Sequence, residues 1–190
     1  MAQAGEKNLI GRMKNIYLLG FMGAGKSSAG KLLAAKTGLA FRDSDAEIKK
    51  AAGADPAELI NRRGLGVFRR LEDSALRKLA RAGGLVVAAG GGVTPTVKRG
   101  FLKRTGITVY LACSESVLLK RLAGDPSARP LLGKVPAERP GVIRRLLAKR
   151  RPYYERADIR LDVSTLTPEL AAAKIAAAVR KYDKNFFIEA

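Results

Sequence analysis

Histidine and tryptophan are both missing from this chain of 190 residues, and it holds a single cysteine, Cys113. Without histidine, a general base has to be a carboxylate, lysine, tyrosine or cysteine, and any metal site has to be built from oxygen ligands. One cysteine can form neither an internal disulfide nor a zinc framework. These absences favour Mg²⁺ over zinc as a metal and are typical of a protein in a reducing cytosol.

Acidic residues are scarce, because 17 Asp and Glu stand against 36 Lys and Arg, which gives a formal net charge of +19. Such a charge predicts attraction to polyanions. Basic residues cluster at 98–99 with 103–104, and at 144–145 with 149–151. Nucleic-acid binding is one interpretation, and a solvated basic surface is the other. Since aromatic residues for base stacking are few and do not alternate with these clusters, the sequence favours the second.

Long apolar runs are lacking as well. The first 14 residues carry charges at Glu6, Lys7, Arg12 and Lys14, and the next apolar stretch is interrupted at Lys26. We therefore expect neither a signal peptide nor a membrane span, and a soluble, cytoplasmic protein. The length and an apolar content of 47% predict one domain over residues 1–190 with a sizeable core.

The most informative stretch is Gly20-Phe21-Met22-Gly23-Ala24-Gly25-Lys26-Ser27, which matches the phosphate-binding pattern G-x-x-x-x-G-K-[ST]. An apolar, β-rich run precedes it and a helical pattern over 28–37 follows. Glycines let backbone N–H groups converge on phosphate oxygens, and the helix N-terminus favours the same anion. The residues expected to bind the nucleotide here are Gly23, Ala24, Gly25, Lys26, Ser27 and Ser28. Lys26 would contact the β and γ phosphates, and the Ser27 hydroxyl would ligate Mg²⁺.

Strands alternate with helices along the rest of the chain. Apolar, β-rich runs predict strands over 15–19, 39–42, 85–89, 107–111 and 158–163. Helical patterns cover 28–37, 46–52, 55–82 with a break at 64–66, 95–103, 114–122, 140–156 and 169–182, the last capped by Thr167. This order predicts an α/β fold, a three-layer α/β/α sandwich around a mainly parallel five-stranded sheet.

Three further features fall at predicted strand ends or in long connections. Asp43 and Asp45 follow the second strand, where open α/β sheets bind ligands, although Asp45 could equally be the N-cap of the next helix. Three glycines, 90–92, follow the third strand, either because the backbone approaches a ligand closely or as a plain connection. The irregular stretch 123–137 holds Arg129 and is typical of a functional lid.

Taken together, these features resemble the shikimate kinase family over about residues 14–182. The resemblance is carried by the phosphate loop, D-S-D at 43–45, F-R-R at 68–70, G-G-G at 90–92, R-P-L-L at 129–132 and K-R-x-P-x-Y at 149–154. The loop alone is shared by many NTPases, whereas the ordered set is specific. The resemblance implies a nucleoside-monophosphate-kinase-like P-loop domain with a helical substrate-binding insertion at about 45–72 and a lid at about 123–137. The implied reaction is transfer of the γ-phosphoryl group of ATP to the 3-hydroxyl of shikimate, in aromatic amino acid biosynthesis.

Residue roles follow from the same resemblance. Asp45 would bind the shikimate hydroxyls and accept the proton of the attacking one, which suits a chain without histidine. The acceptor carboxylate and ring would be held by Arg69, Gly90, Gly91, Gly92 and Arg150. Glu72, one helical turn after Arg69, would orient that arginine.

The donor side has its own implied roles. Lys26 and a mobile Arg129 would stabilise the transferring phosphoryl group, and Arg121 would pack on adenine. Ser27 would ligate Mg²⁺ directly and Asp43 through water.

Two other functions stay open at this point. One is a kinase for another small acceptor, such as gluconate or a nucleoside monophosphate, and the other is a nucleic-acid-associated ATPase that uses the positive charge. The family resemblance implies a monomer, with ATP and shikimate as partners and no membrane contact.

Overall fold

The computed structural model describes residues 14–90, 99–123, 130–132 and 135–187. Five strands form one sheet in the order β2-β3-β1-β4-β5, and every neighbouring pair is parallel. The strands are β1 (Asn15–Leu19), β2 (Ala40–Asp43), β3 (Leu85–Ala88), β4 (Gly106–Ala112) and β5 (Ile159–Asp162). The predicted five-stranded parallel sheet is therefore confirmed, with strand ends shifted by at most one residue.

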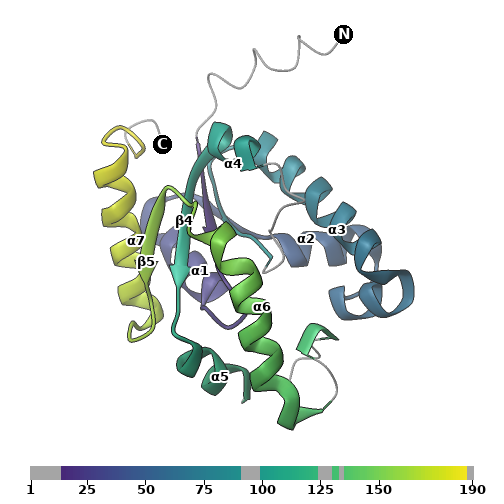
Figure 1. The fold of residues 1–190 in the computed structure, drawn as a ribbon. Helices are drawn as coiled ribbons and strands as arrows, with labels where there is room; N and C mark the ends of the chain where they lie inside the picture. The colour runs from purple at the N-terminus through teal and green to yellow at the C-terminus, as the bar shows by residue number, and fades with distance from the viewer. Residues whose placement is uncertain (1–13, 91–98, 124–129, 133–134, 188–190) are drawn as a thin grey trace.

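Helices cover both faces of this sheet (Figure 1). They are α1 (Lys26–Thr37), α2 (Ser44–Ala52), α3 (Pro56–Ala82), α4 (Arg99–Thr105), α5 (Glu115–Ala123), α6 (Arg139–Tyr154) and α7 (Pro168–Tyr182). α1 packs against α7, and α1 also contacts β2 and β3. α3 and α4 pack on β3 and β4, so the predicted three-layer α/β/α sandwich is observed.

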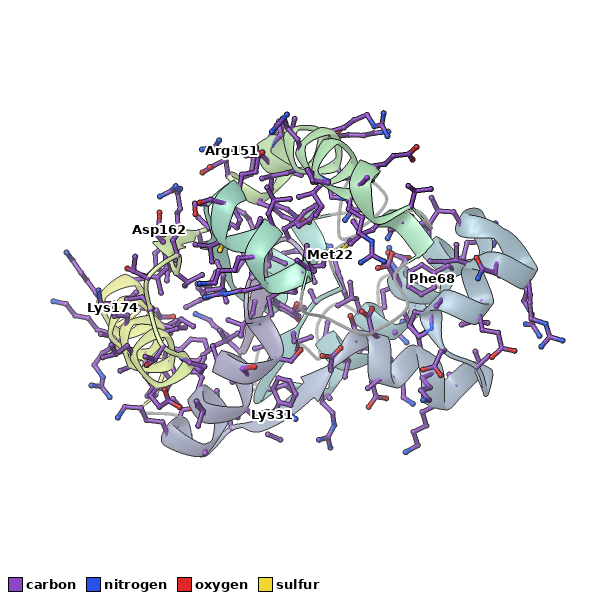
Figure 2. The ribbon with its side chains drawn as sticks, turned by 90° about the horizontal axis from the view of Figure 1, so that it is seen from below. Met22, Lys31, Phe68, Arg151, Asp162 and Lys174 are labelled. Atoms are coloured by element: carbon purple, nitrogen blue, oxygen red, sulfur yellow. The ribbon has the colours of Figure 1, made fainter. Side chains whose placement is uncertain are left out.

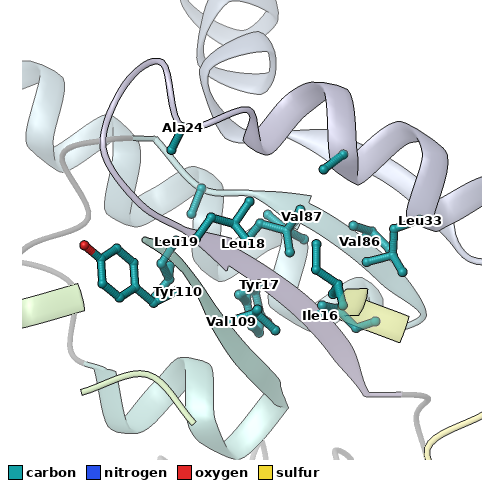
Figure 3. Packing of buried hydrophobic residues seen from close by; sticks show 14 of the residues in the cluster. Ile16, Tyr17, Leu18, Leu19, Ala24, Leu33, Val86, Val87, Val109 and Tyr110 are labelled. Carbon is teal, nitrogen blue, oxygen red and sulfur yellow. The ribbon is translucent and has the colours of Figure 1, made fainter. Parts of the chain in front are cut away.

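The core is centred on β1, whose five residues are all buried. Alternate residues of a strand point to opposite faces, so Ile16 and Leu18 lie toward α1, where Leu33 meets them. Tyr17 lies on the other face of the strand (Figure 3). Its hydroxyl is 2.7 Å from the Thr105 hydroxyl at the end of α4. A central strand buried on both faces places the loop that follows it at a rigid point of the molecule.

α2 and α3 lie beside the sheet, away from α7 (Figure 1). They share a small core of their own, in which Ile48, Leu59 and Phe68 are buried. The helix break predicted at 64–66 is observed inside α3, because Gly64 has φ 81° and ψ 160°. This pair of helices spans 44–82 and so contains the stretch 45–72 expected to be the substrate-binding insertion.

The cap of α2 corrects one alternative from the sequence. α2 begins at Ser44, and its N-cap is Asp43, whose side chain accepts a hydrogen bond from the Asp45 N–H at 3.0 Å. Asp45 is therefore not the N-cap and lies in the first turn. At α7 the prediction is confirmed, since the Thr167 hydroxyl accepts from the Leu170 N–H and Pro168 opens the helix.

The region predicted to be a lid is described only in part. Short 3₁₀ turns occupy Pro130–Leu132 and Pro136–Glu138. Arg129 lies outside the described residues, as do Gly91, Gly92 and the predicted start of the helix at 95–98. No helix in the described parts of the chain has the length and apolar character needed to cross a membrane.

Candidate active site

The phosphate loop joins β1 to α1 and has the backbone that anion binding requires. Gly20, Gly23 and Gly25 have φ of 147°, 80° and 87°, values that other residues rarely adopt. Gly25 is the N-cap of α1, so the first N–H groups of that helix open onto the loop. The Lys26 ammonium donates to the carbonyls of Gly20 and Phe21, both at 3.0 Å, which holds it inside the loop. The predicted strand, loop and helix are all in place.

A cavity of about 720 Å³ lies over this loop. Its floor is formed by loop residues that include Gly23, Ala24, Gly25, Lys26, Ser27 and Ser28. Asp43, Asp45 and Gly90 line one end, and Arg121, Leu166 and Pro168 line the other. The cavity therefore has carboxylates at one end and an arginine with apolar side chains at the other. The phosphate loop lies between the two ends. Met22 of the loop lies near the middle of the view from below (Figure 2).

Ser27 and Asp43 meet at the carboxylate end. The Ser27 hydroxyl donates to Asp43 Oδ2 at 2.7 Å, while Asp43 Oδ1 accepts from the Asp45 N–H. Among the residues that the structure describes, no three His, Cys, Asp or Glu side chains are grouped so as to hold a metal. Mg²⁺ needs only one or two protein oxygens when phosphates and water complete its shell. The pair fits that donor set.

Gly90 brings the end of β3 against two carboxylates. Its N–H donates at 2.8 Å to the hydroxyl of Ser44, which is fully buried. A Cβ at this position would lie 2.7 Å from Asp45 Oδ1 and 2.8 Å from Glu72 Oε1. Because real Cβ atoms do not approach oxygens so closely, any larger residue here would require one or both of these carboxylates to move. The close approach at the first of the three glycines is thus to protein side chains, and the expectation that the backbone here approaches a ligand stays a prediction.

Glu72 is an anchor for the predicted acceptor arginine Arg69. The Arg69 guanidinium donates to Glu72 Oε2 in an i,i+3 ion pair, and the Glu72 side chain is only 3% exposed. Burial raises the pKa of the Glu72 carboxyl above its usual value, although Arg69 acts in the opposite direction. The ion pair confirms the predicted partner of Arg69.

Arg150, the second predicted acceptor arginine, lies on α6 and is 5% exposed. Its guanidinium carbon is 5.6 Å from the centre of the Phe21 ring, in the phosphate loop. It also interacts electrostatically with Glu72, which Arg69 holds. Arg69 and Arg150 thus come from different helices, and both interact with the Glu72 carboxylate.

Arg121 lies at the opposite end of the cavity. Its Nη1 donates to the Gly23 carbonyl at 3.2 Å and lies 3.9 Å from the Cys113 sulfur. Burial raises the pKa of the Cys113 thiol, and Arg121 partly offsets this. The exposed guanidinium of Arg121 and the apolar side chains of Leu166 and Pro168 line the same cavity, a combination suited to a flat ring.

Of the predicted site residues that the structure describes, all line the cavity except Arg69 and Arg150, which both interact with Glu72 next to Gly90. The sequence-based prediction assigned no role to Phe21 and Tyr154, which contact Arg150, or to Ser44, which accepts the hydrogen bond from Gly90. Tyr154 had a signal in the K-R-x-P-x-Y pattern, since it follows Arg150 by four residues on a helix and so shares its face. Phe21 and Ser44 touch partners 129 and 46 positions away, respectively, and no local pattern marks such contacts.

Comparison with known proteins gives a consistent result. The sequence model of the family described as shikimate kinase matches residues 22–180. A shikimate kinase from Thermodesulfovibrio yellowstonii is 42% identical over 90% of this chain and 96% of its own length. One from Geobacter sulfurreducens is 41% identical over 89% of this chain and 92% of its own length.

Solved structures agree with the sequence relatives. Shikimate kinase from Acinetobacter baumannii in complex with shikimate superimposes with a TM-score of 0.84 at 34% identity, covering 93% of this chain and 98% of that one. Shikimate kinase from Aquifex aeolicus gives 0.75 at 32% identity, covering 87% and 96%. A gluconokinase from Sinorhizobium meliloti gives 0.61 at 18% identity, covering 94% and 98%, which shows a shared fold alone.

Proposed function

The chain belongs to the shikimate kinase family, and from that premise we propose how its residues divide the work of the reaction. The enzyme transfers the γ-phosphoryl group of ATP to the 3-hydroxyl of shikimate, giving ADP and shikimate 3-phosphate. Phosphoryl transfer requires positioning and charge stabilisation more than covalent catalysis. Our proposal therefore assigns each side chain to binding a charge, orienting a group or accepting a proton.

ATP takes the loop and the arginine end of the cavity. The N–H groups of residues 23–28 surround the phosphates, and Lys26 supplies a point charge to the β and γ groups. Its present hydrogen bonds to Gly20 and Phe21 keep its ammonium at the loop. Adenine then lies between Arg121 and the apolar wall at Leu166 and Pro168.

Ser27 would hold Mg²⁺ directly and Asp43 would support it through water. The Ser27 hydroxyl, in the first turn of α1, lies 2.7 Å from Asp43 Oδ2 at the end of β2, and both are oxygen donors. The ion would supply positive charge that stabilises the charge developing on the transferring group.

Shikimate takes the carboxylate end of the cavity. Asp45 binds the hydroxyls and accepts the proton of the 3-hydroxyl as it attacks. Arg69 and Arg150 hold the carboxylate, for which a planar guanidinium is well suited, and residues 90–92 contact the ring through their backbone. Arg129, on the lid at about 123–137, closes over the phosphoryl group.

One observation carries this proposal: a single cavity runs from Arg121 past Lys26 to Asp45 and Gly90, so a donor and an acceptor can meet within it. The whole chain of 190 residues is proposed to act as one domain and as a cytoplasmic monomer. A monomer predicts a mass of 20.3 kDa by light scattering.

Substitution of Asp45 by Asn tests the proposed roles. The change keeps size and hydrogen bonding but removes the base, so kcat should fall by about 10²-fold or more. The Kd for ATP should stay within about twofold, because Asp45 is not part of the phosphate loop that is proposed to bind the nucleotide. Asp73→Asn, on α3 in an ion pair with Arg77, is the matched control and should keep kcat. Unchanged turnover in Asp45→Asn would refute the assignment.

A further inference from the structure

Arg150 is an unusual member of its helix, because it is 5% exposed while Lys149 and Arg151 on either side are exposed. A buried guanidinium is costly unless its surroundings compensate its charge and its five N–H donors. The groups around it therefore decide how the guanidinium is oriented. Two of these groups are aromatic side chains that the proposed reaction does not otherwise use.

Phe21 is the first of them. It is the second residue of the phosphate loop, its side chain is 2% exposed, and its ring centre lies 5.6 Å from the Arg150 guanidinium carbon. A guanidinium placed over a ring face is attracted to it, and the attraction is strongest away from water. The contact fixes Arg150 relative to the loop that carries the donor phosphates.

Tyr154 is the second. It lies one helical turn after Arg150 and is fully buried, and its hydroxyl forms a hydrogen bond with Arg150. Burial raises the pKa of Tyr154 to about 12, so the hydroxyl stays protonated at working pH. Its ring stacks on that of Tyr110 in β4, with centres 5.3 Å apart and planes 27° apart. The Tyr154 ring is thus packed against a residue of the sheet, and its hydroxyl forms a hydrogen bond with Arg150.

We propose that Phe21 and Tyr154 are positioning residues that together fix the Arg150 guanidinium toward the carboxylate of shikimate. Phe21 lies against the guanidinium carbon, and Tyr154 occupies one edge through its hydroxyl. Glu72, the ion-pair partner of Arg69, lies close enough to Arg150 for their charges to interact, so the guanidinium is near the proposed acceptor side. This inference rests on the proposed role of Arg150 as a ligand of the acceptor carboxylate. It adds that the specificity for an anionic acceptor depends on two side chains that do not themselves bind the acceptor.

Tyr154→Phe tests the hydroxyl alone, because the remaining ring can still stack on Tyr110. Loss of one hydrogen bond to a charged group should raise the KM for shikimate about 5- to 20-fold. The kcat and the KM for ATP should stay within about twofold. Tyr110→Phe removes a hydroxyl from the other ring of the same stacked pair and is the matched control. It should leave all three constants unchanged.

Phe21→Leu tests the ring face while keeping an apolar side chain in the loop. It should raise the KM for shikimate about 3- to 10-fold. Melting temperatures of all variants should be recorded, so that loss of fold is separated from loss of positioning.

The amide of shikimate, which has no charge on the carboxyl carbon, separates positioning from a general structural effect. In the wild-type enzyme, kcat/KM should be higher for shikimate than for the amide by a large factor. That factor should shrink at least threefold in Tyr154→Phe and Phe21→Leu, because the guanidinium is no longer aimed at the carboxylate. If both acceptors lose kcat/KM equally, the two residues are structural and the inference is wrong.

Arg150→Lys distinguishes failure of this inference from failure of the proposed function. If Arg150→Lys leaves the KM for shikimate unchanged, Arg150 does not bind the carboxylate and both proposals about it fail. If Arg150→Lys raises that KM while Tyr154→Phe and Phe21→Leu keep the wild-type preference for shikimate over its amide, only the positioning inference fails.

Discussion

At the scale of one residue, Gly90 leaves the space in which two carboxylates of the candidate site lie. The glycine leaves room for Asp45 and Glu72 to lie against the backbone at the end of β3, where a methyl group would be within 2.8 Å of both carboxylates. Two acids can approach each other in this space because Arg69 neutralises one of them. Their proximity is set by the absence of a side chain at Gly90.

Replacing Gly90 with alanine should therefore impair the acceptor side selectively. The added methyl should displace Asp45 or Glu72, lower kcat/KM for shikimate at least tenfold and destabilise the fold by about 1–3 kcal/mol. The Kd for ATP should change little, which equilibrium titration would show. Gly141→Ala is the control, since a Cβ at that position of α6 meets nothing within 4 Å. Equal activity in the two variants would contradict this account.

Asp158 supplies a second residue-scale prediction, on stability and pH. Its carboxylate accepts from the Thr108 N–H at 2.9 Å and the Thr108 hydroxyl at 2.6 Å, and it pairs with Lys103 at 2.8 Å. Burial alone would raise the pKa of Asp158, but these hydrogen bonds outweigh it and lower the pKa below 3.8. The ionised carboxylate is thus stabilised in the folded state.

The sign of the pH dependence follows from the lowered pKa. Stability from Asp158 is fully present above the unfolded-state value of 3.8 and is lost as the pH falls through the folded-state value. Asp158→Asn should cost about 1–3 kcal/mol of unfolding free energy at pH 7, and this difference should shrink below about pH 4. Urea unfolding at a series of pH values measures it, and a difference that does not vary with pH would contradict the assignment.

At the scale of elements, a break at Gly64 divides α3, one of the two helices proposed to bind the substrate, into two parts. Gly64 has φ 81° and ψ 160° in the middle of the helix, and nothing lies within 4 Å of where its Cβ would be. Any penalty for a side chain there must come from the backbone conformation, since there is ample space.

Two glycines two residues apart therefore make a matched pair. Gly64→Ala should lower the unfolding free energy by about 1–3 kcal/mol, because alanine is strained in that conformation. Gly66→Ala also meets nothing within 4 Å and has no positive φ, so it should be neutral or stabilise by up to about 1 kcal/mol. Chemical denaturation of both variants compares them directly, and a similar effect of the two would rule out backbone strain as the cause.

The elements predicted from the sequence were those whose signals are local. The phosphate loop, the buried strands, the break at Gly64 and the Thr167 cap each depend on residues within a few positions of one another. The cap of α2 was left open between two roles for Asp45, because Asp43 and Asp45 are both good caps and only the backbone distinguishes them. The incorrect alternative, Asp45 as the N-cap, was supported by the same residue preference as the correct one, Asp43.

The same distinction between local signals and long-range contacts applies to the candidate site. Charged residues such as Lys26, Asp45 and Arg150 could be identified because their chemistry and spacing form a known set. The groups that hold them could not, because Phe21 meets Arg150 and Ser44 meets Gly90 only after the sheet brings α6, α2 and β3 around the loop. Packing between distant segments leaves no periodic trace in the sequence.

At the scale of the whole molecule, the surface is strongly basic. Lys31, Arg151 and Lys174 are exposed and lie at the edges of the view in Figure 2, on α1, α6 and α7. Some of the exposed arginines form ion pairs: Arg144 with Glu115 at 2.8 Å and Arg151 with Glu155 at 3.4 Å. Such exposed pairs add little to stability and are weakened by salt. The spread of charge over several elements is consistent with a solvated basic surface.

The central claim is that one cavity couples ATP to a shikimate acceptor, and the most direct measurement is ADP release with different additions. The coupled assay should contain Mg²⁺ and near-physiological salt, and compare no acceptor, shikimate, gluconate and an RNA polymer. We predict ADP release that depends on shikimate and stays at the basal rate with the other additions. Release that shikimate leaves unchanged, or that gluconate or RNA stimulates instead, would contradict the account.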